Sequence, residues 1–289
     1  YDTAGAAYDF IGLFRTEFLY MENDHMPTEE EQFSVYRRIL EGAQGKPVTL
    51  RTLDIGGDKT LPYFSLPKED NPFLGFRAVR YCLDRKEMYK IQLRALIRAS
   101  VFGKIKIMIP LVTCVNELRE VKALVEDIKA DLDRENIPYD KNISVGVMIE
   151  TPAASEIADL LAKEADFFSI GTNDLTQYTM AVDRGNSKVA YLYSVYNPAV
   201  IRSIKRIISA AANENIIAGM CGEAAADPLL TPLLISFGLK EFSVNASSIL
   251  RTRAQIAKWT KAEADKVADE VMKCATQEEV YEILKRYER

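Results

Sequence analysis

Two short apolar runs near the middle of the chain each end abruptly on polar residues. Residues 144–149 and 167–170 are almost continuously apolar, which is typical of strands buried on both faces of a parallel sheet. Glu150 follows the first run, and Asn173 and Asp174 follow the second. Parallel α/β folds keep their chemistry at the carboxyl ends of such strands. If the two strands are neighbours, both acids point at one spot.

The same alternation of apolar runs and helical patterns extends along the chain. The expected strands are residues 11–14, 48–50, 104–109, 144–149, 167–170, 216–220 and 242–244. The expected helices include residues 28–41, 85–102, 116–134, 198–213 and 228–237, and Thr276 and Glu279 form a capping-box pattern before another helix. About seven strand–helix units without a long polar linker predict a (β/α)8 TIM barrel, an α/β fold with residues 1–289 in a single domain. Its eighth strand would lie before Tyr1 or is not recognised.

Composition excludes several classes of protein. The 289 residues carry a formal net charge of −5, so no general basic field attracts nucleic acid. No apolar run approaches the ~20 residues of a membrane span, and the first residues show no signal-peptide pattern. Four cysteines without CxxC spacing indicate neither disulfides nor zinc. We therefore expect a cytoplasmic protein. His25 is the one histidine, which excludes a histidine-rich metal site in this chain.

Charged and reactive side chains gather after the expected strands. They are Arg15, Arg51, Glu150, Asn173, Asp174, Cys221 and Glu223, with Arg77 and Arg184 in nearby loops. Guanidinium groups suit phosphate and carboxylate, so several arginines in one place imply a multiply charged anion. Two carboxylates without histidine or cysteine partners suit a hard cation, Mg²⁺ or alternatively Mn²⁺. Cys221 could give or take a proton at such a ligand.

Each of these residues also has a structural interpretation. An arginine at a strand end is commonly held in an ion pair with a nearby acid. Asp174 could cap a turn, and Cys221 could be a small buried hydrophobe. His25 fits a surface loop. Only the convergence of many such residues at successive strand ends favours a functional site over these interpretations.

Six longer motifs occur in order along the chain. They are residues 12–19 (GLFRTEFL), 51–59 (RTLDIGGDK), 71–77 (NPFLGFR), 146–152 (GVMIETP), 168–177 (FSIGTNDLTQ) and 219–223 (GMCGE). With them the chain closely resembles the C-terminal, phosphoenolpyruvate-binding domain of Enzyme I of the bacterial phosphotransferase (sugar uptake) system. Residues 182–186 and 221–227 favour Enzyme I over pyruvate phosphate dikinase and phosphoenolpyruvate synthase.

The resemblance implies a (β/α)8 barrel that dimerises and binds phosphoenolpyruvate with Mg²⁺. Matched by position, Glu150 and Asp174 correspond to metal ligands, and Cys221 to the acid that protonates the enolate to give pyruvate. The residues matched to substrate binding are Arg15, Arg51, Arg77, Asn173, Asp174 and Arg184. Lys59 lies in a matching motif but receives no role.

The resemblance also implies partners outside this chain. In the family, a histidine on a separate N-terminal domain accepts the phosphoryl group and passes it to the carrier protein HPr. His25 does not lie in the corresponding motif, so we expect the chain to bind substrate and metal without its acceptor. Three alternatives remain: the C-terminal domain of a dikinase or synthase, a metal-dependent carbon–carbon lyase, and a non-catalytic regulatory or dimerisation module.

Overall fold

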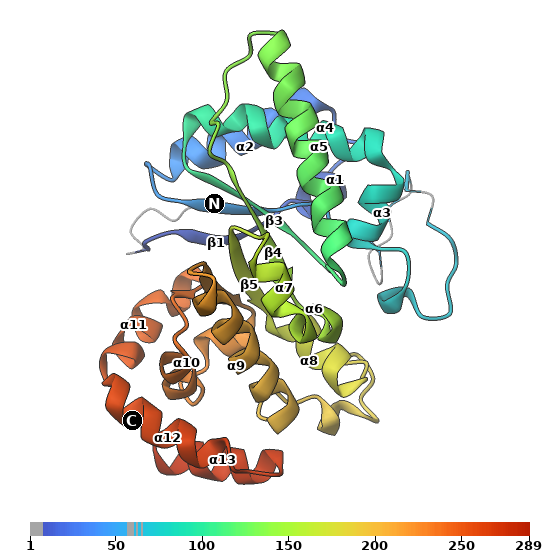
Figure 1. Cartoon of the computed structure of the whole chain (residues 1–289). Coiled ribbons are helices and arrows are strands. Elements are labelled where there is room, and N and C mark those ends of the chain that lie inside the picture. The colour runs from blue at the N-terminus through green and yellow to red at the C-terminus, as the bar shows by residue number, and fades with distance from the viewer. Residues whose placement is uncertain (1–7, 57–60, 62, 65) are drawn as a thin grey trace. The chain divides into compact units, whose positions relative to one another are not determined.

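The computed structural model describes residues 8–56, 61, 63, 64 and 66–289 (Figure 1). Most of the chain divides into two compact units, one from Asp9 to Val147 and one from Met148 to Arg289. Strand order follows the chain from β1 to β7 in the described residues, and helices separate the strands. Successive parallel strand–helix units are the topology of the (β/α)8 barrel, so the expected α/β fold class is confirmed. The assignment of residues 1–289 to a single domain stays a prediction.

The first unit contains four parallel strands, and all but the first are largely buried. They are β1 (Ile11–Arg15), β2 (Val48–Arg51), β3 (Ile105–Ile109) and β4 (Ser144–Ile149), whose last two residues belong to the second unit. The register pairs Leu50 with Ile107 and Ile107 with Val145, and all three side chains are buried. The helices are α1 (Glu17–Met21), α2 (Glu29–Gly42), α3 (Ala78–Asp84), α4 (Lys86–Ala99) and α5 (Val115–Arg134), with 3-10 turns at Pro72–Leu74 and Ser100–Phe102. Helix α4 packs against α2 and α5 (Figure 1).

The second unit continues the pattern after β4. Its strands are β5 (Phe167–Gly171), β6 (Ile217–Cys221) and β7 (Glu241–Phe242), which pair in parallel. Its helices are α6 (Pro152–Glu156), α7 (Ala158–Ala162), α8 (Thr172–Met180), α9 (Pro198–Asn213), α10 (Thr231–Phe237), α11 (Ile249–Ala257), α12 (Lys261–Val271) and α13 (Gln277–Arg286). Three 3-10 turns are Ala190–Leu192, Glu223–Ala226 and Ala246–Ser248. Helix α9 packs against α7 and β6, and α12 packs against both α10 and α13.

Several element ends differ from the sequence expectation. The helix expected over residues 85–102 ends at Ala99 and tightens into a 3-10 turn before Gly103. Helix α10 begins at Thr231, because residues 228–230 form a turn before Pro232 enters the first helical turn. The last strand is Glu241–Phe242, where residues 242–244 were expected. Among the described helices, none combines the length and apolar character that a membrane span requires.

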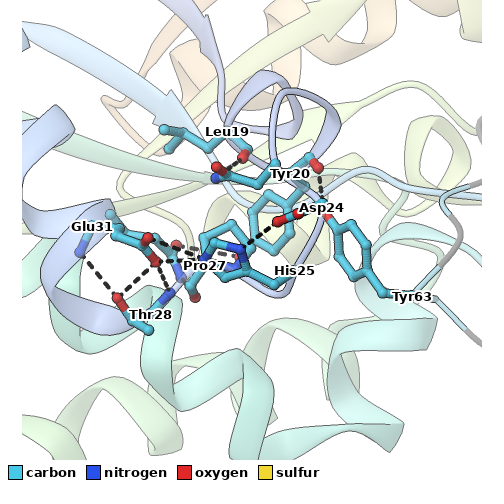
Figure 2. Close-up of polar contacts among 10 residues, drawn as sticks. Leu19, Tyr20, Asp24, His25, Pro27, Thr28, Glu31 and Tyr63 are labelled. Atoms are coloured by element: carbon cyan, nitrogen blue, oxygen red, sulfur yellow. Dashed lines mark hydrogen bonds and ion pairs between the residues drawn. The ribbon is translucent and has the colours of Figure 1, made fainter.

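His25 ties the loop after α1 to the start of α2. Its Nδ1 lies 2.9 Å from Asp24 Oδ1, and its Nε2 lies 3.1 Å from Glu31 Oε1 (Figure 2). Glu31 also completes the capping box with Thr28, so the imidazole joins the cap of α2. The His25 side chain is about half exposed, which confirms its interpretation as a surface-loop residue.

This contact makes a pH-dependent contribution to stability that replacement by Ala would remove. Hydrogen bonds that His25 donates to the carboxylates of Asp24 and Glu31 raise its pKa above the ordinary 6.5. The stabilisation is therefore complete below pH 6.5 and is lost as pH rises through the raised value. The pKa values of Asp24 and Glu31 are lowered, so their share is lost as pH falls through those lowered values. We expect the Tm difference between the wild type and His25→Ala to be largest near pH 6 and to shrink by pH 9, as measured by thermal unfolding. A difference that does not change with pH would contradict this.

Candidate functional site

Two arginines stand side by side at the carboxyl ends of β1 and β2. The parallel register pairs Arg15 with Arg51, the last residue of each strand. Neighbouring strands lie about 4.8 Å apart, so these two backbone positions are close. The Arg15 side chain is exposed and that of Arg51 is buried. The sequence prediction that arginines gather at successive strand ends is therefore met within the first unit.

Arg51 and Arg77 lie in a buried ionic group that we call the arginine cluster, together with Glu17 and Asp54. Arg51 Nη1 lies 2.9 Å from Asp54 Oδ2, and Arg77 Nη2 lies 2.8 Å from Asp54 Oδ1. Arg51 Nη2 also pairs with Glu17 Oε1. All four side chains are at most 7% exposed. Both arginines are therefore ion-paired, as the structural interpretation predicted. Two guanidinium groups share the single carboxylate of Asp54.

A glycine brings the loop after β2 against Arg77. Gly56 has a φ of +115°, a conformation that residues with a side chain rarely adopt. A Cβ atom added there would lie 2.4 Å from Cβ of Arg77, which leaves no room for a side chain. Ala78 N–H also donates to the carbonyl of Ile55 at 3.1 Å. Gly57 to Lys59 of the same motif lie outside the described residues.

In the second unit, two functional candidates, Glu150 and Cys221, lie next to Gly171. Glu150 follows the last residue of β4, and Thr151 caps α6 by accepting a hydrogen bond from Ala154 N–H at 3.1 Å. A Cβ atom added at Gly171 would lie 2.7 Å from Glu150 Oε2, which is too close for a side chain. The buried carboxylate of Glu150 therefore packs directly against the backbone at the end of β5. The register pairs Gly171 with Cys221 at the end of β6. We call Glu150, Gly171, Asn173, Asp174 and Cys221 the Gly171 cluster.

Asn173 and Asp174 lie in the first turn of α8, directly after Gly171. Arg184 Nη1 lies 3.2 Å from Asp174 Oδ1, and the backbone N–H of Arg184 donates to Gln177 Oε1 at 3.2 Å. The loop after α8 is thus folded back onto that helix. The Arg184 side chain is 40% exposed, so this ion pair is open to solvent on one side.

Cys221 is buried beside the start of α8. Its Sγ lies 3.6 Å from the carbonyl oxygen of Ile170, and its own carbonyl accepts a hydrogen bond from Thr172 Oγ1 at 3.1 Å. Gly222, with a φ of +95°, turns the chain sharply here. A Cβ atom added to Gly222 would lie 2.5 Å from Thr172 Oγ1 and 3.1 Å from Asn173 Oδ1. Cys221 and Gly222 are therefore held close to the first turn of α8, which carries Asn173 and Asp174.

The donor set of the Gly171 cluster suits a hard cation. Glu150 and Asp174 are both buried carboxylates. The described part of the chain contains no group of three or more histidine, cysteine, aspartate or glutamate side chains placed to hold a metal. Two protein carboxylates leave the other coordination positions to substrate oxygens and water, the arrangement that Mg²⁺ commonly adopts at phosphate sites.

A family profile described as "PEP-utilising enzyme, PEP-binding domain", where PEP is phosphoenolpyruvate, matches residues 2–261. The chain belongs to this family. The resemblance to the Enzyme I domain, which six sequence motifs indicated, is confirmed by this match and by the names of curated relatives. Proteins named phosphoenolpyruvate-protein phosphotransferase from Priestia megaterium and Geobacillus stearothermophilus are 53% and 55% identical to it. The matches cover 95% and 96% of this chain and 48% of each relative.

The chain thus spans about half the length of the curated relatives it matches. Their name favours the phosphotransferase over the dikinase or synthase that the sequence left open. A citrate lyase crystal structure from Burkholderia xenovorans LB400 aligns with a TM-score of 0.52 at 15% identity, covering 89% of this chain and 78% of that one. This likeness concerns the fold alone.

Three residues near the clusters of this PEP-binding domain were not singled out from the sequence. Glu17 and Asp54 complete the arginine cluster. Tyr193 donates a hydrogen bond to the carbonyl of Asn173 at 3.2 Å. Burial raises the pKa of Tyr193, and the nearby Arg184 acts in the opposite direction. Glu17 and Asp54 each lie two or three residues after a predicted arginine, a spacing that could have indicated them.

Proposed function

We propose that this chain binds phosphoenolpyruvate with a divalent cation and forms the phosphoenolpyruvate-binding part of a phosphoenolpyruvate-protein phosphotransferase. The observation that carries the proposal is the position of Glu150 and Cys221 next to Gly171, with Asp174 in the first turn of α8 directly after this residue. An acid pair can hold a metal and a thiol can supply a proton, and both contributions would assist cleavage of an enol phosphate.

Each residue has a role that follows from its chemistry. Arg15, Arg51, Arg77 and Arg184 would bind the phosphate and carboxylate of the substrate, because a guanidinium donates paired hydrogen bonds to such groups. Asn173 would add an amide contact from the first turn of α8. Glu150 and Asp174 would hold Mg²⁺, with Mn²⁺ as the alternative. When bound, the cation would neutralise charge on the transferring phosphoryl group.

The reaction balances with Cys221 as the acid. The bond between phosphorus and the enol oxygen breaks as the phosphoryl group passes to a histidine nitrogen of the acceptor domain. The enolate left behind takes a proton at its methylene carbon from the Cys221 thiol, which gives pyruvate. The thiolate then regains a proton from water. Burial of Cys221 beside the start of α8 would keep bulk water from competing as the proton donor.

The proposal extends to partners that this chain does not contain. The acceptor would be a histidine on an N-terminal domain, which passes the phosphoryl group to HPr in the cytoplasm. A second copy of this chain would complete a homodimer.

The test is pyruvate release from phosphoenolpyruvate and Mg²⁺, read with a coupled dehydrogenase. The chain is assayed alone, then with an N-terminal fragment that carries the acceptor histidine, and then with HPr added. We expect release only when the acceptor is present. Activity with a nucleotide-binding partner domain instead of HPr would identify a dikinase or synthase. Turnover of a 2-oxo acid or acyl thioester by the chain alone would identify a lyase.

A further inference from the structure

Asp54 is shared between two buried arginines. Its Oδ2 lies 2.9 Å from Arg51 Nη1, and its Oδ1 lies 2.8 Å from Arg77 Nη2. Each of its oxygens therefore accepts from a different guanidinium. Because the two oxygens belong to one carboxylate, both paired Nη atoms are held by the same side chain. One side chain thus sets the spacing of two cations.

The backbone around Asp54 is itself fixed from α4. Leu53 N–H donates to Gln92 Oε1 at 2.8 Å, and the Tyr89 hydroxyl contacts Thr52 Oγ1 at 3.2 Å. Gln92 and Tyr89 are fully buried. Residues 52–54 therefore cannot shift without breaking buried hydrogen bonds, which are costly to leave unmade.

Arg51 is oriented from a second side by the β1–α1 junction. Glu17, in the first turn of α1, pairs with Arg51 Nη2. The neighbouring Thr16 hydroxyl donates to the carbonyl of Arg51 at 2.8 Å, so the backbone and the side chain of Arg51 are both tied to this junction. A planar guanidinium held at two nitrogens has a defined plane and direction.

Stability alone is a weak reason for this arrangement. Desolvating two charges offsets much of their attraction, and apolar residues of the same volume often stabilise a core as well or better. A buried carboxylate can orient a neighbouring guanidinium group, whereas an apolar residue cannot. An Nη group carries two hydrogens, so one that donates to Asp54 has the chemistry to donate to a second acceptor as well.

We propose that Asp54 is a positioning residue that aligns Arg51 and Arg77 for one phosphate- or carboxylate-bearing ligand, with Glu17 fixing the plane of Arg51. This inference rests on the proposed function, because it takes the two arginines as substrate-binding residues. Asp54 acts through them and has no contact with the ligand in this account.

The first test replaces Asp54 by Asn and measures phosphoenolpyruvate binding by calorimetry at fixed Mg²⁺. The Asn side chain keeps the shape but has a single acceptor oxygen, so one of the two arginines loses its contact with residue 54. We expect the Kd to rise by about 10–100-fold, the range typical of losing a group that orients a binding side chain. The matched control is Asp84→Asn, because Asp84 pairs with Arg85 in an exposed position on α3. The control should bind as the wild type does.

A double-mutant cycle separates positioning from a general structural effect. If Asp54 acts through Arg77, then Asp54→Asn should weaken binding little further in an Arg77→Lys background. Equal losses in both backgrounds would overturn the inference. Should Asp54→Asn fail to fold by circular dichroism, Glu17→Gln with Arg51→Lys provides the same cycle through the other pair.

The outcomes distinguish this inference from the proposed function. Wild-type protein that binds neither phosphoenolpyruvate nor inorganic phosphate would overturn both. Wild-type binding with no change in Asp54→Asn would overturn the positioning role alone. Tighter binding by Asp54→Asn would show that the carboxylate competes with the ligand, which also overturns it. A weaker, non-additive effect in the cycle supports it.

Discussion

Replacing Glu150 by Gln is expected to weaken Mg²⁺-dependent binding of phosphoenolpyruvate by at least about 100-fold. Losing a residue that only supports a metal ligand typically costs 10–100-fold, so losing a ligand itself should reach the upper end of that range. Glutamine has nearly the same volume as glutamate, so the close packing of this side chain on Gly171 is retained. The effect should therefore arise from charge and not from a cavity.

Calorimetry of phosphoenolpyruvate binding at several Mg²⁺ concentrations measures this effect. The matched control is Glu156→Gln, six residues further along the same strand–helix unit, where the side chain is exposed and pairs with Arg206. Glu150 is a cleaner choice than Asp174, because Asp174 also pairs with Arg184 and its replacement would disturb two functions at once. Wild-type affinity and wild-type Mg²⁺ dependence in Glu150→Gln would remove Glu150 from the metal site.

The strands that carry the site were predictable because they are buried on both faces. A fully buried strand is a continuous apolar run, and such a run ends where a polar residue becomes tolerable. The carboxyl ends of β4 and β5 could therefore be located from the sequence, and Glu150 and Asp174 were identified as the acids that follow them. The short helices α1 and α3, of five and seven residues, are too brief to show a helical period, and the sequence did not indicate them.

The partners of the arginines were much harder to predict. Charge and spacing indicated Arg51 and Arg77 as anion-binding residues, but Arg77 meets Asp54 across 23 positions of sequence. The meeting depends on the turn at Gly56, whose positive φ has no sequence signal beyond the glycine itself. Tyr193 is a similar case, because its contact with Asn173 spans 20 positions through an irregular loop. Pairings made by loops follow from tertiary packing and not from local pattern.

Gly171 shows how one small residue organises several functional groups. Its sequence context marked it only as the end of an apolar run. In the structure its missing side chain is the space into which Glu150 fits, and its backbone pairs with that of Cys221. The sequence thus predicted the members of the cluster, while their meeting point became apparent only from the packing of β4, β5 and β6.

Replacing Cys221 by Ala is expected to lower pyruvate formation by the complete phosphotransferase by roughly 10²–10⁴-fold, the usual contribution of a general acid. Binding of phosphoenolpyruvate should change only slightly, because the proposed role of the thiol begins once the enolate forms. The loss should therefore appear in kcat with KM nearly constant. Cys221→Ser should be similarly impaired, since a serine hydroxyl is a far weaker acid than a thiol.

Cys274→Ala is the matched control for Cys221→Ala. Cys274 is also a buried thiol of the second unit, and its Sγ lies 3.7 Å from a backbone carbonyl, that of Glu270, much as Cys221 Sγ lies 3.6 Å from that of Ile170. The two variants remove the same atoms from similar surroundings, so an effect of lost packing alone should be shared by both. Full activity in Cys221→Ala would show that Cys221 is a small buried hydrophobic residue without a catalytic role. A large loss confined to Cys221→Ala would therefore come from the position of Cys221 at the end of β6, beside the first turn of α8 that carries Asn173 and Asp174.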